Sequence, residues 1–153
     1  MNYGKSQLGF TVIEVLVVIG IFAILAALGL FFSMDFYKTY SYNSEQVNVA
    51  SVLSKARARS LANVNESWHG VRITGNKLTL FQGSNPVKSW ANRNTAKDED
   101  VPASSGLSIS DQDVIFDQLS GNTGCPPADC VITVSGLGQS KTIKVTSQGA
   151  IIW

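Results

Sequence analysis

The sequence predicts an α+β fold in which one long N-terminal helix packs on a small antiparallel β-sheet head. An apolar, charge-free run from Val15 to Phe32 continues into an amphipathic helical pattern that ends at about Val64. Short segments with alternating apolar and polar residues follow, separated by glycine-containing turns. Because these connections are short, we expect antiparallel pairing in one or two small sheets.

The apolar run has the length of a membrane span. Val15–Phe32 holds no charged or strongly polar side chain, and at about 1.5 Å per residue such a helix matches the thickness of a bilayer core. Glu14 stands at its N-terminal edge, where an ionised group is unfavourable in lipid, so we expect it to have a partner. Lys5 precedes the run with no acid nearby, which predicts a cytoplasmic N-terminus and a head outside.

The amphipathic part of the helix is expected to lie on the head. No proline precedes Pro86, so we predict an unbroken helix from Phe10 to about Val64. One face carries small and apolar residues, and the other carries polar and basic residues. The predicted packed face consists of Val49, Leu53, Ala56, Ser60 and Val64, flanked by Ala50 and Leu61. The predicted solvent face consists of Asn48, Ser51, Lys55, Arg59 and Asn63.

The strands are predicted from period-two patterns. A hairpin is expected with strands Trp68–Thr74 and Lys77–Phe81 and a turn at Gly75-Asn76. The polar stretch from Gly83 to Gly106 is predicted to be a surface loop with one edge strand near Val87–Trp90. Later strands are expected at Val114–Phe116, Val131–Ser135, Lys141–Thr146 and Ala150–Trp153.

Length and charge limit the possible functions. Once a span is set aside, 153 residues leave room for one small head and no second domain. The formal net charge is +1, from twelve basic and eleven acidic side chains, so no strong electrostatic partner such as nucleic acid is indicated by the whole chain.

Two cysteines, Cys125 and Cys130, flank a proline-rich turn. In an exported head we expect them to form a disulfide, which contributes about 2 kcal/mol for so short a loop in the chain-entropy model. The alternatives are a reduced pair and a metal site. Zinc would need further ligands, and His69 is the only histidine in the chain, so the metal reading is disfavoured.

No catalytic motif is found in the sequence, so we expect no enzyme activity, no cofactor and no metal. His69 lies on a predicted strand and is interpreted as a surface or edge side chain rather than a general base. Asp111, Asp113 and Asp117 have some features of a calcium loop, but its fifth position would be Ile115 and the glycine is misplaced. We interpret these acids as solvated turn residues.

The N-terminal motif Gly9-Phe10-Thr11-Val12-Ile13-Glu14 before an apolar helix resembles the class III signal of type IV pilins and type II secretion pseudopilins. This resemblance implies that prepilin peptidase cuts after Gly9 and that Phe10 becomes the N-methylated first residue. It also implies that Glu14 pairs with the N-terminus of a neighbouring subunit during assembly. The implied domains are a leader at 1–9, a transmembrane and filament-core helix at 10–33, and a head at 34–153.

A looser resemblance covers the whole chain. The helix motif Val52-Leu53-Ser54-Lys55-Ala56-Arg57, the strand WHGVRI, the segment VIFDQLSGNTG and the ending Gly149-Ala150-Ile151-Ile152 are similar to GspH/FimT-type minor pilins and pseudopilins. The resemblance implies a minor subunit of a type IV pilus or type II secretion pseudopilus, acting in assembly initiation or at the tip. Its partners would be other pilins through the N-terminal helix, prepilin peptidase and the inner-membrane assembly platform.

The main alternative is a DNA-binding minor pilin of a competence pilus. The densest basic group is Lys55, Arg57 and Arg59, of which Arg57 is expected to point toward the packed face. Some FimT-like proteins bind DNA through a C-terminal Gly-Arg-x-Arg motif, and the matching place here, Gly149 to Ile152, has neither arginine. A third reading is an unprocessed membrane anchor that carries an unknown enzyme.

Overall fold

The computed structural model describes residues 9–75, 77–104, 106–125, 129–136 and 138–153, with the backbone alone at 30–35. The chain divides into two compact units, Met1–Thr39 and Tyr40–Trp153. Helix α1 (Val12–Leu61) is continuous across 50 residues, as the absence of an internal proline predicts. The predicted α+β class is confirmed, with the strands arranged in two antiparallel sheets.

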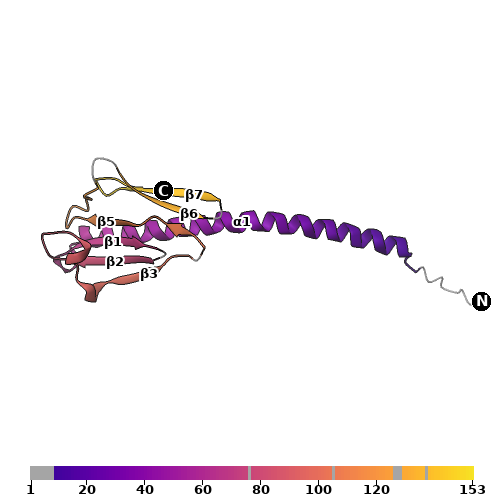
Figure 1. Ribbon diagram of the computed structural model, residues 1–153, viewed down its shortest axis with the longest axis horizontal. Coiled ribbons are helices and arrows are strands. Elements are labelled where there is room, and N and C mark those ends of the chain that lie inside the picture. The colour runs from indigo at the N-terminus through magenta and orange to yellow at the C-terminus, as the bar shows by residue number, and fades with distance from the viewer. Residues whose placement is uncertain (1–8, 76, 105, 126–128, 137) are drawn as a thin grey trace, which may run out of the picture. The chain divides into compact units, whose positions relative to one another are not determined.

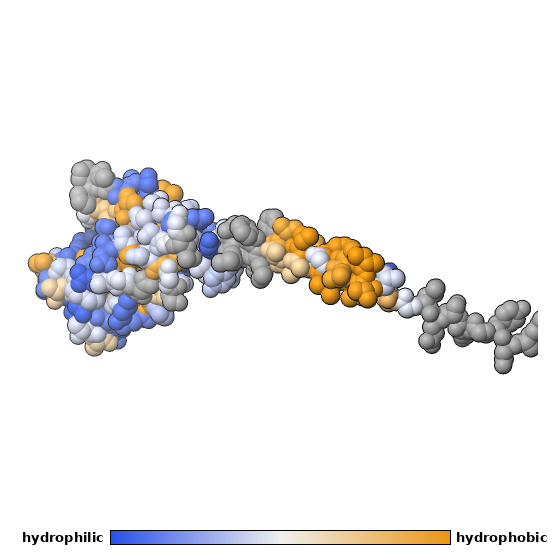
Figure 2. Space-filling model, turned by 45° about the vertical axis from the view of Figure 1, so that its right-hand side comes forward, coloured by the Kyte–Doolittle hydropathy of each residue, from blue (hydrophilic) through white to orange (hydrophobic). Residues whose placement is uncertain are grey.

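The first unit is an apolar helix with an open surface. Within it, Val12–Gly29 is long and apolar enough to cross a membrane, and none of this segment is buried. Apolar side chains cover its described surface (Figure 2). An exposed helix that is apolar all round is stable in lipid or against other helices, and not in water.

The second half of α1 carries the predicted packed face. Val49, Leu53 and Ala56 are fully buried, and Ser60 is buried with them. The prediction was wrong at Leu61 and Val64, which are 44% and 37% exposed, because α1 ends at Leu61. Just beyond it the chain takes left-handed conformations, at Asn63 (φ 53°) and again within the 3₁₀ turn η1 (Val64–Glu66), so the helical register does not extend to Val64.

The first sheet has strand order β3-β2-β1-β5 and contains the predicted hairpin. Strands β1 (Trp68–Thr74) and β2 (Lys77–Gly83) pair from Thr74 opposite Lys77 to Trp68 opposite Gly83. Strand β5 (Gln112–Phe116) pairs with the other edge of β1.

The predicted edge strand near Val87–Trp90 is absent from its described residues. The edge strand of this sheet is β3 (Glu99–Pro102), where Val101 pairs with Leu78 and packs against the core. Trp90 instead opens a 3₁₀ turn, η2 (Trp90–Asn92), and its ring packs edge-on against Phe81 at 5.0 Å between centroids. A second short turn, η3 (Thr95–Lys97), leads into β3. Tertiary aromatic packing therefore overrides the local strand preference of this segment.

The second sheet has strand order β4-β6-β7-β8. Strands β6 (Cys130–Gly136) and β7 (Gln139–Val145) form its central hairpin and match the prediction closely. The predicted last strand is reduced to β8 (Ile151–Ile152). Strand β4 (Ser108–Ile109) was not predicted, because two residues are too few to show an alternating pattern.

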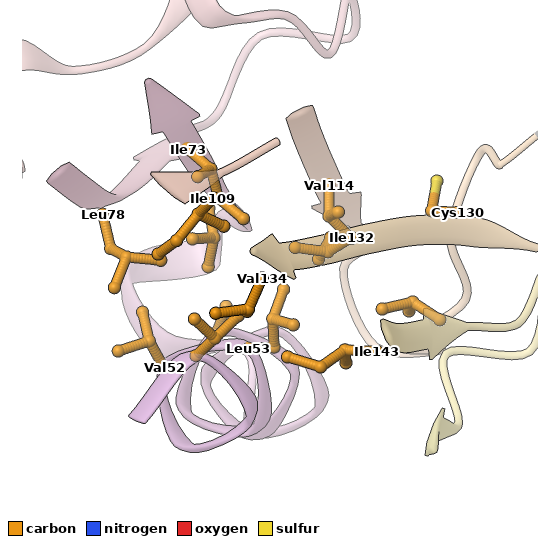
Figure 3. Packing of buried hydrophobic residues seen from close by; sticks show 14 of the residues in the cluster. Val52, Leu53, Ile73, Leu78, Ile109, Val114, Cys130, Ile132, Val134 and Ile143 are labelled. Carbon is orange, nitrogen blue, oxygen red and sulfur yellow. The ribbon is translucent and has the colours of Figure 1, made fainter. Parts of the chain in front are cut away.

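Both sheets and the second half of α1 share one core. In Figure 1 the strands of both sheets run alongside the C-terminal part of α1. Val52 and Leu53 from α1 meet side chains of both sheets, including Leu78 of the first and Ile143 of the second (Figure 3). The helix therefore joins the two sheets, and its last turns contact β5 through Ser60 and Phe116 and lie beside Ile151 of β8.

Candidate functional site

The first turn of α1 is capped by Thr11. The backbone N–H groups of Glu14 and Val15 donate to the Thr11 carbonyl oxygen at 3.1 and 3.3 Å, and the Thr11 Oγ1 lies 3.4 Å from the Glu14 nitrogen. Thr-x-x-Glu is the sequence pattern of a capping box, and a carboxylate is favoured at the positive end of the helix dipole. Glu14 is therefore well placed structurally even without a partner subunit.

Gly9, Phe10 and Glu14 are all exposed. The Phe10 ring is 83% exposed, and Phe10 and Glu14 line one shallow notch of ≈ 240 Å³ with Val15, Val18 and Ile19. An acid at the rim of an apolar notch is open to a cationic group from another chain. The rest of the predicted leader, residues 1–8, lies outside the described residues.

His69 lies on β1 as predicted, but the expectation of a surface or edge position was wrong. Its side chain is fully buried, because β1 is an inner strand and His69 faces the end of α1. Its backbone N–H donates to Ser60 Oγ at 2.9 Å, and Ser60 Oγ donates in turn to the Phe116 carbonyl at 3.1 Å. Burial, and then the nearby charge of Arg59, hold the pKa of His69 below its ordinary value. This histidine is part of the core.

The predicted basic group is divided by the fold. Lys55 and Arg59 lie on the solvent side of α1, and both form ion pairs with Glu99 of β3. Their contact, with the Lys55 hydrogen bond as the largest cause, lowers the pKa of Glu99. Arg57 points elsewhere, as its helical position predicts, and its Nη2 donates to the Gln148 carbonyl at 3.2 Å.

The three aspartates near β5 do not converge. Asp111 accepts a hydrogen bond from the Gly75 backbone at 2.8 Å, Asp113 pairs with Arg72 at 2.7 Å, and Asp117 pairs with Lys88 at 2.6 Å. In the described part of the chain there is no group of three or more His, Cys, Asp or Glu side chains that could hold a metal ion.

Cys125 and Cys130 are joined by a disulfide, with 5.5 Å between their Cα atoms. Residues 126–128 inside the loop lie outside the described residues. Cys130 opens β6 and packs against the core, so the bond ties this turn to the second sheet.

Glu45 is a buried acid that the sequence patterns did not single out. Its side chain is fully buried, one Oε accepts from the Ser104 backbone N–H at 2.8 Å, and the other accepts from Asn48 Nδ2 at 3.3 Å. Helical spacing alone could have predicted this burial, because Glu45 lies on the same helical face as the buried residues Val49 and Val52. It holds the segment at Ser104 onto α1.

An apolar N-terminal helix with a capped acid in its first turn, followed by an α+β head, defines a protein of pilin-like architecture and fits a membrane-anchored pilin. Residues 4–30 match the family model of the prokaryotic N-terminal methylation motif. This match indicates a type IV pilin-like prepilin. Proteins with this motif have structural roles, assemble with other pilins and are processed by prepilin peptidase. No curated protein and no solved structure matches the chain significantly.

Proposed function

We propose that this chain is a minor structural subunit, a pilin or pseudopilin, of a type IV pilus or type II secretion pseudopilus, with a role in assembly initiation or at the tip. The observation that carries the proposal is the matched methylation motif, in which Gly9 and Phe10 precede an exposed Glu14 on an apolar helix. The proposed topology has a cytoplasmic N-terminus, a span at residues 10–33 in the inner membrane, and a head on the other side.

The proposed mechanism is mechanical. The apolar helix is held by lipid until assembly, when packing against neighbouring helices replaces the lipid contact. Cleavage after Gly9 frees the Phe10 amine, and Glu14 then pairs with that amine on a neighbouring subunit. Because burying two charges is expensive unless their geometry is good, this pair sets the register of the helices more than it adds stability.

The DNA-binding alternative is less well supported by the head. Lys55 and Arg59 already share one carboxylate, and Arg57 is partly buried against the Gln148 carbonyl. Each phosphate contact needs an available cation, so this group supplies few contacts. The place of the Gly-Arg-x-Arg motif is occupied by Gly149 followed by apolar residues.

Two substitutions at Glu14 test the proposal, because the capping box gives Glu14 a second possible role. Glutamine can replace glutamate in a capping box but carries no charge. We therefore expect Glu14→Gln and Glu14→Ala to be cleaved and inserted normally, and both to be lost from filaments. The measurement is the fraction of the chain in sheared filaments, by immunoblot, against the total membrane pool.

The matched control is Thr11→Ala, which removes the capping side chain and leaves the Glu14 charge. It should enter filaments at close to the wild-type level. Normal incorporation of Glu14→Gln would show that the carboxylate serves only as a cap and that the proposed pairing is absent.

A further inference from the structure

A small surface groove lies on the head where the last turns of α1 meet β8. It has a volume of ≈ 230 Å³ and is lined by Ser54, Arg57, Ala58, Leu61, Ile151 and Trp153. These residues come from parts of the chain about ninety positions apart, and the turn at Gly149 holds the two parts together. The Gly149 N–H donates to the Thr146 carbonyl at 2.8 Å, and Arg57 Nη2 donates to the adjacent Gln148 carbonyl.

Large apolar side chains are exposed in this groove. Leu61 is 44% exposed and Trp153 is 59% exposed. Leu119, which is 65% exposed, is tied to the same end of α1 through its backbone hydrogen bond to the Ser60 carbonyl at 2.9 Å. Clustered apolar side chains on a head that faces water indicate a contact surface rather than a solvent surface.

Arg57 is the one charged side chain among the residues that line the groove. Each of the other three arginines pairs with a carboxylate: Arg59 with Glu99, Arg72 with Asp113 and Arg93 with Asp98. Across the described residues no carboxylate pairs with Arg57, and its Nε is buried without a hydrogen-bond partner. A partner cannot reach the buried Nε, but a carboxylate at the part of the guanidinium group that lines the groove would supply the missing counter-charge.

We propose that this groove is a docking site for a neighbouring pilin-like subunit, which presents an Asp or Glu side chain beside an apolar side chain. The identity of the partner rests on the proposed function. The carboxylate binds Arg57 while the apolar side chain packs against Leu61 and Trp153. A single cation set among apolar groups suits a protein segment, whereas DNA needs several cations along its backbone.

A different subunit is a better occupant than a second copy of this chain. Most carboxylates of this head already have a cation or hydrogen-bond donor of their own. These are Glu45, Asp98, Glu99, Asp100, Asp111, Asp113 and Asp117. Among the described acidic side chains of the head, a second copy could offer only Glu66 and Asp129 to Arg57 without breaking one of these contacts.

Photo-crosslinking of the full chain in its native host tests the proposal. The residue p-benzoylphenylalanine is placed at Ala58, an exposed position in the groove, and in a matched control at Val87, which is 62% exposed and lies outside it. We expect a cross-link at Ala58 alone. The linked peptide, identified by mass spectrometry, should come from another pilin-like subunit and contain an Asp or Glu next to an apolar residue.

Charge reversal gives the sharper readout. Arg57→Glu should lower the yield of the Ala58 cross-link at least about tenfold, and changing the partner's acid to Lys should restore it. Because Arg57 also holds Gln148, the fold of each variant is checked by protease resistance. Trp153→Ser removes an exposed side chain without disturbing the core, and it should lower the yield as well.

The same cells report on the proposed function through leader cleavage and filament incorporation. A cleaved and incorporated chain with no Ala58 cross-link above the Val87 control would overturn the docking site alone. So would a cross-link to a second copy or to DNA, or a yield unchanged in Arg57→Glu and Trp153→Ser. A chain that is neither cleaved nor incorporated would overturn the proposed function and the docking site together.

Discussion

His69 illustrates at the residue scale how the fold decides the chemistry of a side chain. A histidine in a strand with alternating polar and apolar residues is expected to face solvent. His69 is instead fully buried and contacts Ser60 near the end of α1. Burial and the Arg59 charge both favour the neutral imidazole. The consequence is a dependence of stability on pH rather than a catalytic role.

We predict that the free energy of unfolding falls as the pH is lowered through about 6.5. The pKa of His69 is lowered in the folded state, so below about 6.5 the unfolded chain binds a proton that the folded chain does not. Each pH unit in this window should remove up to about 1.4 kcal/mol of stability.

Denaturant titrations of the detergent-solubilised chain between pH 7.5 and about 5.5 measure this slope. The control variant His69→Gln should have a flat profile over the same range. The ion pairs of Glu99 and Asp100 do not contribute to this slope, because the pKa values of both carboxyl groups are lowered and change the stability only at more acid pH. An equal slope in wild type and His69→Gln would refute the assignment.

At the scale of elements, the turn before β8 joins the end of the chain to α1. Gly149 has φ +75°, and a Cβ at this position would overlap the Gly121 carbonyl oxygen and lie 2.8 Å from Arg57 Nε. Only glycine fits both the backbone conformation and the space. The glycine that resembles the first position of a DNA-binding motif therefore has a packing role here.

Gly149→Ala is predicted to destabilise the chain by about 1 to 3 kcal/mol or more, from positive φ and overlap together. Gly138→Ala is the matched control, since Gly138 also has positive φ (+81°) but has no atom within 4 Å of a Cβ. Thermal unfolding of both variants measures the difference. Equal decreases in the unfolding temperature of the two variants would mean that overlap with Gly121 and Arg57 does not contribute to the destabilisation.

The disulfide turn is a second element with a direct test. Cys125 and Cys130 are bonded, and the described residues contain no free cysteine. We therefore expect thiol labelling of the denatured, unreduced chain from its native membrane to find no reactive cysteine. Labelling should reach two thiols per chain only after reduction. Stoichiometric labelling without a reductant would show that the bond is not formed in the cell.

At the scale of the whole molecule, the sequence was sufficient for features that depend on local periodicity. The long helix, the β1–β2 hairpin and the buried positions Val49, Leu53 and Ala56 all follow from spacing along the chain. The capping box at Thr11 and Glu14 was also readable from sequence. Helical geometry also predicted that Arg57 would point away from Lys55 and Arg59. It did not predict the partners, which are the Gln148 carbonyl for Arg57 and Glu99 for Arg59.

Features that depend on distant pairing were not predictable in this way. The edge strand β3 forms because Val101 reaches Leu78, and β4 forms because Ile109 reaches Val134. The burial of His69 and the contact of Arg57 with the Gln148 carbonyl depend on segments that only the tertiary fold brings together. Local sequence patterns do not identify partners that are distant along the chain.

The central claim is that this chain is a processed pilin-like subunit, and the N-terminus of the mature protein tests it most directly. Intact-mass and peptide mass spectrometry would be applied to the chain extracted from membranes of cells with and without prepilin peptidase. The account predicts a chain that begins at N-methylated Phe10 when the peptidase is present, and an intact leader when it is absent. A chain that retains Met1 in cells with active peptidase would contradict the account.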